Sequence, residues 1–168
     1  MVNFKRLLGH FFFLPGARAR AFPPTVLKAI EAEIGASEKV HTGELRFAIE
    51  TDLPLWAVWR GVSGRSRALE VFSNLRVWDT EHNSGVLIYL LLADHDIQIV
   101  ADRGITALVD QREWDQIAQA IERAFRDGQF EQGVVSGIRA ITTLLARHFP
   151  PTGNNPDELP NRPVLLRR

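Results

Sequence analysis

A short polar loop near the middle of the chain carries oxygen side chains at alternate positions. Asp79, Glu81 and Asn83 follow this spacing, which is how a calcium-binding loop presents its ligands. The loop is not an EF-hand, because its glycine comes one place late and Leu90 stands where the bidentate glutamate belongs. Ca²⁺ or Mg²⁺ is the cofactor that such residues could hold, and no motif indicates an organic cofactor.

Strand pairing predicts a fourth ligand. The loop precedes a wholly apolar strand, 86–93, and the turn Asp94-His95-Asp96 leads into an alternating strand, 97–101. Because a tight turn joins antiparallel neighbours, the end of the second strand returns to the start of the first. We therefore expect Asp102 to lie beside the loop, which gives a predicted metal set of Asp79, Glu81, Asn83 and Asp102.

The same corner suggests one reaction, the hydrolysis of a phosphomonoester. A metal held by Asp79 and Asp102 would polarise a phosphoryl oxygen and activate water. Arg103 would then stabilise the developing negative charge, and His82 would donate a proton. The alternative is a solvated polar corner in which Asp79 caps the loop backbone, because polar loop clusters are more common than sites.

A second polar cluster is expected at the other end of the sheet, where residues 50–52 meet the turn at 94–96. An apolar strand that enters Asp94-x-Asp96 is similar to the nucleophile motif of haloacid-dehalogenase phosphatases. However, Gln98 stands where that motif has Thr or Val, and no lysine follows Lys39. We interpret residues 94–96 as a hairpin turn, a common place for aspartate.

The elements that position these residues follow from hydrophobic spacing and turn signals. Residues 53–62, with Trp56 and Trp59, have no firm assignment and could mark a partner-binding surface. The order helix–strand–helix–strand–strand–helix–helix predicts an α/β fold, a three-layer α/β/α sandwich with a small mixed sheet. The expected helices begin near Pro24, at Ser63 or Ser66, at Asp110 and after Gly128, and the first strand spans 44–51.

Composition excludes several classes of function. The 168 residues contain no cysteine, so disulfides and thiolate chemistry are absent. The net charge is zero, but residues 1–20 carry +4 without an acid, whereas residues 21–149 carry −5. An acidic body argues against nucleic-acid binding. A basic arm on such a body suits an anionic membrane surface or an acidic partner.

Both ends of the chain look like extensions of one domain. Residues 1–21 form a basic, Phe-rich arm whose apolar residues are Leu7, Leu8, Phe11, Phe12 and Leu14. The arm is a poor signal peptide, so we expect a cytoplasmic protein that could be peripheral at the inner membrane, with secretion as the less favoured alternative. The arm could lie as an interfacial helix or pack on the domain. Residues 150–168 contain five prolines and are expected to be disordered.

The central region, 22–149, resembles the TPM domain family. The likeness rests on Ala68, Phe72, Leu75, Trp78, the Asn83–Gly85 step, Arg103-Gly104 and the Phe125–Phe130 step. This resemblance implies a Rossmann-like fold. It also implies metal binding and a phosphatase activity, since both are attributed to members of the family, and accessory roles beside membrane proteins such as LemA.

Two hypotheses follow. The first is a non-catalytic TPM module that its arm recruits to the membrane surface, where it acts through a protein partner. The second is a divalent-metal-dependent acid phosphatase that uses the Asp79, Glu81 and Asp102 corner. The first is favoured because no nucleophile stands at a defined spacing.

Overall fold

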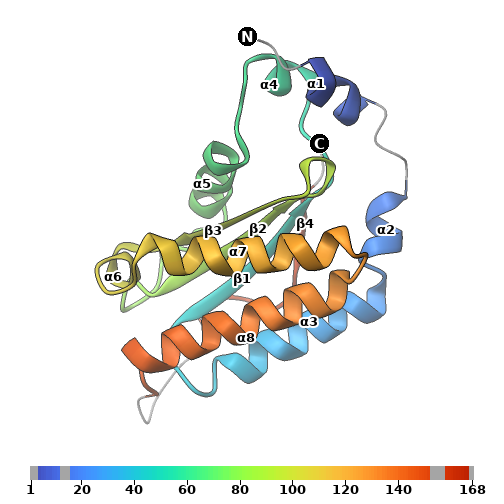
Figure 1. Ribbon diagram of the computed structural model, residues 1–168. Coiled ribbons are helices and arrows are strands. Elements are labelled where there is room, and N and C mark those ends of the chain that lie inside the picture. Colours follow the sequence, from blue (N-terminus) through green and yellow to red (C-terminus); the bar gives the residue numbers. More distant parts are fainter. Residues whose placement is uncertain (1–3, 12–15, 152–157, 167–168) are drawn as a thin grey trace.

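A computed structural model describes residues 4–11, 16–151 and 158–166 (Figure 1). The longer helices are α1 (Phe4–Phe11), α3 (Pro24–Ser37), α5 (Gly64–Asn74), α7 (Gln111–Arg126) and α8 (Phe130–His148). The shorter ones are α2 (Ala17–Ala21), α4 (Leu55–Trp59), α6 (Arg103–Thr106) and the 3₁₀ turn η1 (Leu92–Asp94). The strands are β1 (Glu44–Glu50), β2 (Gly85–Leu91), β3 (Asp96–Ala101) and β4 (Val164–Leu166).

The four strands form one mixed sheet in the order β3-β2-β1-β4. Strands β1 and β2 are parallel, with Glu44 opposite Gly85 and Glu50 opposite Leu91. Strands β2 and β3 are antiparallel, with Val86 opposite Ala101. The predicted parallel pair and the predicted hairpin are therefore both confirmed, and each end of the sheet gathers residues distant in sequence.

Helices cover both faces of the sheet, which confirms the three-layer α/β/α prediction. Because strand side chains alternate between faces, Phe47 and Ile88 join one core cluster with residues of α3, α7 and α8. Leu87 and Tyr89 join a second cluster with residues of α4 and α5. Burial on both faces explains why β2 is apolar throughout.

Helix starts agree with the capping signals. The Ser63 hydroxyl accepts a hydrogen bond from the Ser66 N–H and begins α5, and the Asp110 carboxylate accepts one from the Arg112 N–H and begins α7. The unassigned segment 53–62 contains α4, which buries Ala57 and Val58. Its two tryptophans face solvent.

The N-terminal arm makes contact with the domain through α1, which packs against α4 and η1 (Figure 1). Leu7 packs against the second core cluster, and His10 is buried. The side chains of Phe4, Leu8 and Phe11 are exposed. Phe12 and Leu14, which the arm prediction also included, lie outside the described residues.

The expectation of a disordered tail is wrong for residues 158–166. Leu159 is buried, and β4 pairs in parallel with β1, Val164 lying opposite Ala48. The high proline content of this segment led to the expectation of disorder. Proline is nevertheless compatible with an edge strand, because not every N–H group of such a strand pairs with a neighbour. The C-terminal segment also explains why all seven residues of β1 are buried. They include the polar face of the strand, which the alternation of polar and apolar residues predicts to meet solvent or a polar layer. Arg46 on that face donates a hydrogen bond to the Arg162 carbonyl.

Candidate functional site

The loop at 79–84 is closed by its own backbone and by Thr80. The Asn83 N–H donates to the Thr80 carbonyl, and the Ser84 N–H donates to the Thr80 hydroxyl at 2.9 Å. Asn83 adopts a left-handed backbone with φ 51°, a conformation that asparagine tolerates. Asp79 was the predicted cap, but Thr80 has that role here. The sequence offered a signal for it, because threonine hydroxyls also close turns.

Asp102 lies beside this loop, as the hairpin predicts. Its N–H donates to the Gly85 carbonyl at 2.9 Å, because Asp102 follows β3 where β2 begins. Its Oδ1 accepts a hydrogen bond from the Arg103 N–H at 2.7 Å and so starts α6. The Gly104 N–H in turn donates to the Asn83 carbonyl at 3.2 Å. The two segments are thus joined by main-chain hydrogen bonds.

Gly104 allows this close approach. A Cβ atom at this position would lie 2.7 Å from the Asn83 carbonyl oxygen and 2.8 Å from that of His82. Real Cβ contacts essentially never fall under 3.0 Å, so any side chain would push the loop away from α6. The glycine of the Arg103-Gly104 pair therefore allows the loop to pack closely against α6.

The predicted ligands come together only in part. Asp102 is 8% exposed, and its Oδ2 is buried with no hydrogen-bond partner among the described residues. That oxygen suits a cation. Asn83 Oδ1, however, accepts a hydrogen bond from Arg103 Nε at 3.0 Å, so a positive charge already occupies it. Asp79, Glu81 and His82 are exposed.

The described acids and histidines do not form a preformed metal site. Within residues 4–11, 16–151 and 158–166, no group of three or more His, Asp and Glu side chains is placed to hold a metal ion. The described residues of this corner therefore offer one buried carboxylate oxygen without a hydrogen-bond partner, from Asp102, and the exposed carboxylates of Asp79 and Glu81, but no preformed set of three ligands.

Two further acids near this corner contact neighbouring main-chain groups: Glu158, which was not anticipated here, and Glu44, which the start of the first strand places at this end of the sheet. The Glu158 carboxylate accepts a hydrogen bond from the Glu81 N–H at 2.9 Å. The Glu44 carboxylate, fully buried at the start of β1, accepts one from the Leu159 N–H at 3.0 Å. Both contacts depend on the C-terminal segment, whose position no local sequence signal predicts.

At the opposite end of the sheet, Glu50 is bound by two side chains. Arg67 donates to both of its oxygens, from Nε at 2.8 Å and Nη2 at 2.9 Å, and the Tyr89 hydroxyl donates at 2.6 Å. The hydrogen bonds to Glu50 raise the pKa of Arg67. Burial, with the hydrogen bond to Glu50 second, raises the pKa of Tyr89. This buried, bidentate arrangement leaves Glu50 little capacity for a ligand.

Asp94 is also committed to internal partners. Arg6 donates to Oδ2 from Nε at 2.9 Å and Nη2 at 2.7 Å, and His10 Nε2 lies 3.0 Å from Oδ1. The Leu53 N–H donates to His10 Nδ1, which assigns the ring proton to Nε2. Burial raises the pKa of Asp94, but hydrogen bonds from His10 and Arg6 outweigh it and hold the pKa below its usual value. Asp94 thus binds α1 to the domain.

Near the start of β1, His41 is buried in a chain of hydrogen bonds. The Gly43 N–H donates to Nδ1, so Nε2 carries the proton and donates to the Ser37 hydroxyl at 2.7 Å. The Ser37 hydroxyl lies 2.6 Å from that of Thr142, which donates to the Ile138 carbonyl. Burial lowers the pKa of His41 to about 4. The neutral ring is therefore a structural link between α3 and α8.

Comparison with known proteins identifies the family. The model of the TPM domain matches residues 17–144. This chain belongs to the TPM domain family. The NMR structure of the BA42 protein from the psychrophilic bacterium Bizionia argentinensis is similar, with 35% identity and a TM-score of 0.74. The similarity covers 84% of this chain and 92% of that one.

A more distant likeness concerns the fold alone. The solution NMR structure of the N-terminal domain of a P. gingivalis protein has 16% identity and a TM-score of 0.58. It covers 72% of this chain and 76% of the other. The comparison with curated proteins gives no match. The TPM resemblance read from the helix, the loop and the Arg103-Gly104 step is thus confirmed.

Proposed function

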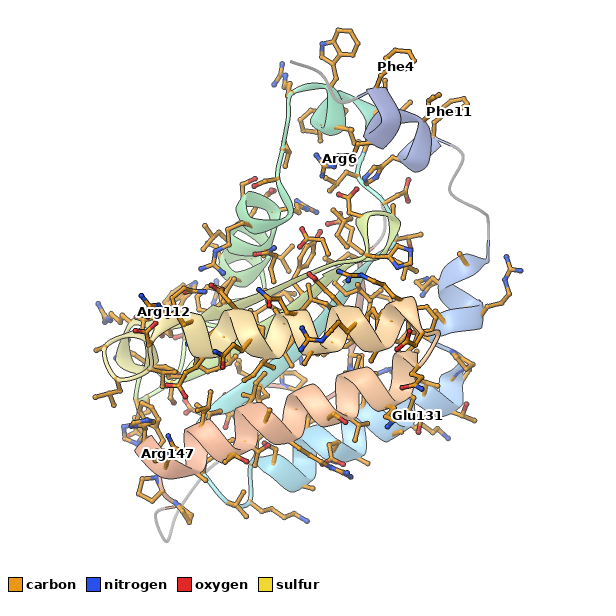
Figure 2. The ribbon with its side chains drawn as sticks, viewed as in Figure 1. Phe4, Arg6, Phe11, Arg112, Glu131 and Arg147 are labelled. Atoms are coloured by element: carbon orange, nitrogen blue, oxygen red, sulfur yellow. The ribbon has the colours of Figure 1, made fainter. Side chains whose placement is uncertain are left out.

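We propose that this TPM protein is a non-catalytic accessory module that works at the cytoplasmic face of a membrane with a protein partner, LemA-like membrane proteins being the class to test first. One observation carries the membrane part. On helix α1, the side chains of Arg6 and His10 point toward the domain together with Leu7, whereas the apolar side chains of Phe4, Leu8 and Phe11 are exposed. Figure 2 shows Phe4 and Phe11 on the outer side of α1 and Arg6 on the inner side.

This orientation is the reverse of the usual one. A helix on a soluble domain normally buries its apolar stripe and exposes its charges. Phe4 is 65% exposed and Phe11 61%. Ion pairing to Asp94 fixes this orientation, and the exposed face suits an apolar or interfacial environment. Among the described helices, none is long and apolar enough to cross a bilayer.

The non-catalytic part rests on the polar groups. At the carboxyl end of the parallel strands, where α/β proteins commonly bind ligands, Glu50 and Asp94 are held by arginines of the same chain. A general acid or base needs an accessible group. The carboxylates at this end of the sheet fit structural roles better than catalytic ones.

The test is membrane partitioning of the full chain against a variant that lacks residues 2–20. The variant is expected to move to the soluble fraction, because the exposed phenylalanines are lost. Since the deletion also removes Arg6 and His10, a second variant, Phe4→Ser with Phe11→Ser, keeps the ion pairs. Its matched control is Val40→Ser with Leu108→Ser, two exposed apolar residues elsewhere. Unchanged partitioning of both arm variants would refute the membrane role.

The partner part needs a separate test. Crosslinking of the full chain in native membranes, followed by mass spectrometry, is expected to yield one dominant membrane-protein adduct. The same adduct should weaken when the Phe4 and Phe11 pair is replaced, since the arm brings the module to the surface. A chain that partitions to membranes without any reproducible adduct would reduce the proposal to a membrane-binding module.

A second candidate, a divalent-metal-dependent acid phosphatase, is favoured by one observation, the buried and unpartnered Oδ2 of Asp102. Asp102, Asn83, Asp79 and Glu81 would hold Ca²⁺ or Mg²⁺, which would polarise a phosphoryl oxygen when bound. Arg103, on the same corner, would bind a phosphate oxygen once it left Asn83. The Arg103 hydrogen bond to Asn83 weighs against this candidate.

Cation titration separates the two candidates. Ca²⁺ and Mg²⁺ should shift the amide signals of residues 79–83 and 102 if the corner binds a cation, and leave them unchanged otherwise. Turnover of p-nitrophenyl phosphate that disappears in Asp79→Ala and in Asp102→Ala would support the enzyme. Turnover that survives both substitutions would place any activity elsewhere.

A further inference from the structure

Helix α4 presents an apolar surface like that of α1. Trp56 is 62% exposed and Trp59 60%, and Leu55 beside them is also exposed. Residues three apart on a helix share a face, so the two indole rings project on one side while Ala57 and Val58 face the core. Tryptophan at this exposure is unusual for a side chain with so much apolar area.

The two surfaces are adjacent. Helix α1 packs against α4, and both lie together at one end of the molecule (Figure 1). Of the eleven large hydrophobic side chains exposed among the described residues, six belong to these two short helices. They are Phe4, Leu8 and Phe11 on α1 and Leu55, Trp56 and Trp59 on α4. Concentration of this kind marks an interaction surface, whereas scattered apolar residues need no explanation.

The two segments that form this surface carry no acidic residue, and Asp94, which lies beneath α1, is paired with Arg6. Neither residues 1–20 nor residues 53–69 contain an aspartate or glutamate, and the second segment carries Arg60, Arg65 and Arg67. The Arg60 guanidinium lies 5.7 Å from the centre of the Trp56 ring, a cation–π distance. Arg67 is bound to Glu50, whereas Arg60 is exposed and follows Trp59 directly in the chain. Aromatic rings beside arginine match the boundary between acyl chains and anionic headgroups.

The polar contacts beneath α1 make the surface a fixed one. Asp94 receives Arg6 and His10, and the Leu53 N–H donates to His10, two residues before α4 begins. The same contacts therefore hold both helices in register. A peptide arm alone would have to order itself on a membrane, at an entropic cost that this prior docking avoids.

We propose that α1 and α4 together form one lipid-docking surface, which places Phe4, Phe11, Trp56 and Trp59 at the interface of an anionic membrane with Arg60 among the headgroups. This inference rests on the proposed membrane function and deepens it, since it assigns the contact to a composite surface instead of the arm alone. The occupant is a lipid surface: neither segment contains an acidic residue, Asp94 beneath α1 is paired with Arg6, and Arg60 beside Trp56 complements anionic headgroups.

The experiment uses the full chain with two kinds of vesicle, phosphatidylcholine alone and phosphatidylcholine with phosphatidylglycerol at a three-to-one ratio. Cosedimentation gives the bound fraction, and a blue shift of tryptophan emission reports insertion. The test variant is Trp56→Gln with Trp59→Gln, and the matched control is Trp78→Gln, an exposed tryptophan after α5. Melting temperatures verify that each variant is folded.

The wild type is expected to bind the anionic vesicles more tightly than the neutral ones. The double variant should bind at least ~10-fold more weakly, because two interfacial side chains are lost, and the Trp78→Gln control should bind like the wild type. Arg60→Gln should reduce the preference for anionic vesicles and leave the blue shift in place.

The outcomes separate this inference from the proposed function. If the wild type binds and the double variant binds equally well, α4 is not part of the surface and only the arm acts, which overturns the inference alone. If the wild type ignores both vesicles but crosslinks to a membrane protein through α4, the surface serves a protein, which also overturns it. If neither vesicles nor native membranes retain the wild type, the inference and the proposed function fall together.

Discussion

The two ends of the sheet use carboxylates in opposite ways. At the carboxyl end of the parallel strands, Glu50 and Asp94 each receive an arginine of the same chain. At the other end, Asp102 keeps one buried oxygen without a partner among the described residues, and its neighbour Arg103 donates to Asn83 instead. The carboxylates of the first end form internal ion pairs that stabilise the fold, whereas at the second end one carboxylate oxygen lacks a hydrogen bond from any described residue. The second end therefore retains a buried oxygen that a ligand could use.

Glu50→Gln should have the largest effect on stability. The side chain of Arg67 is largely buried, and the substitution removes its charged partner. It also weakens the short hydrogen bond that the Tyr89 hydroxyl donates. Breaking a buried pair of this kind costs about 4 kcal/mol. Urea unfolding measures the loss, and the control is Glu70→Gln, an exposed partner of the same arginine, which should cost less than about 1 kcal/mol. Equal losses would show that the network is no stronger than a surface pair.

Acid should destabilise the protein through His41. Its folded pKa of about 4 is below the ordinary 6.5, so the neutral ring is favoured. The stabilisation is complete above pH 6.5 and is lost as the pH falls toward 4, by about 3 kcal/mol at ~1.4 kcal/mol per unit. Unfolding free energies between pH 7 and 4 measure the slope. His41→Gln should flatten the curve, whereas His82→Gln, at an exposed position, should leave the slope unchanged.

Asp94→Asn should loosen one helix more than the whole molecule. The change removes the charge that Arg6 and His10 share, at a cost of about 1 kcal/mol for a partly buried pair that keeps some contact with solvent. Amide exchange of residues 4–11 should accelerate while that of β2 stays slow, and Asp127→Asn provides the exposed control. Because the pKa of Asp94 lies below its usual value, the contribution holds at neutral pH and disappears as acid protonates the carboxyl. Uniform acceleration across the chain would contradict a local role.

Asp102→Asn should change stability least. The side-chain oxygen of asparagine can still accept the hydrogen bond that caps α6. Because Oδ2 of Asp102 has no hydrogen-bond partner among the described residues, the melting temperature should shift by no more than about 2 °C. The informative measurement is the difference between wild type and variant in a Ca²⁺ titration. A stabilisation present only in the wild type would establish the unmatched oxygen as a ligand. Identical titrations would make the two ends of the sheet equally structural.

The layers of the fold could be predicted from the sequence because buried apolar residues recur with the period of a helix or a strand. The apolar run of β2, the alternation of β3 and the caps Ser63 and Asp110 all act locally, so they can be read without the fold. The hairpin also predicted that Asp102 returns to the loop, since pairing fixes register.

What the sequence could not predict depends on distant contacts. Nothing near Asp94 indicates that Arg6, far away in the chain, will bind it, and nothing near Glu81 indicates Glu158. The same holds for the orientation of α1. Its spacing predicts an amphipathic helix, but the carboxylate beneath it decides which face turns outward.

The C-terminal strand has a practical consequence for anyone who alters the chain. Strand β4 pairs with β1 for only three residue pairs, yet it shields main-chain groups of a strand whose residues are all buried. A shortened protein that ended before Glu158 would present those groups to other molecules, which is a template for edge-to-edge aggregation. Affinity tags and truncations at this terminus are therefore a hazard to solubility, and loss of Glu158 would also remove the hydrogen bond from the Glu81 N–H.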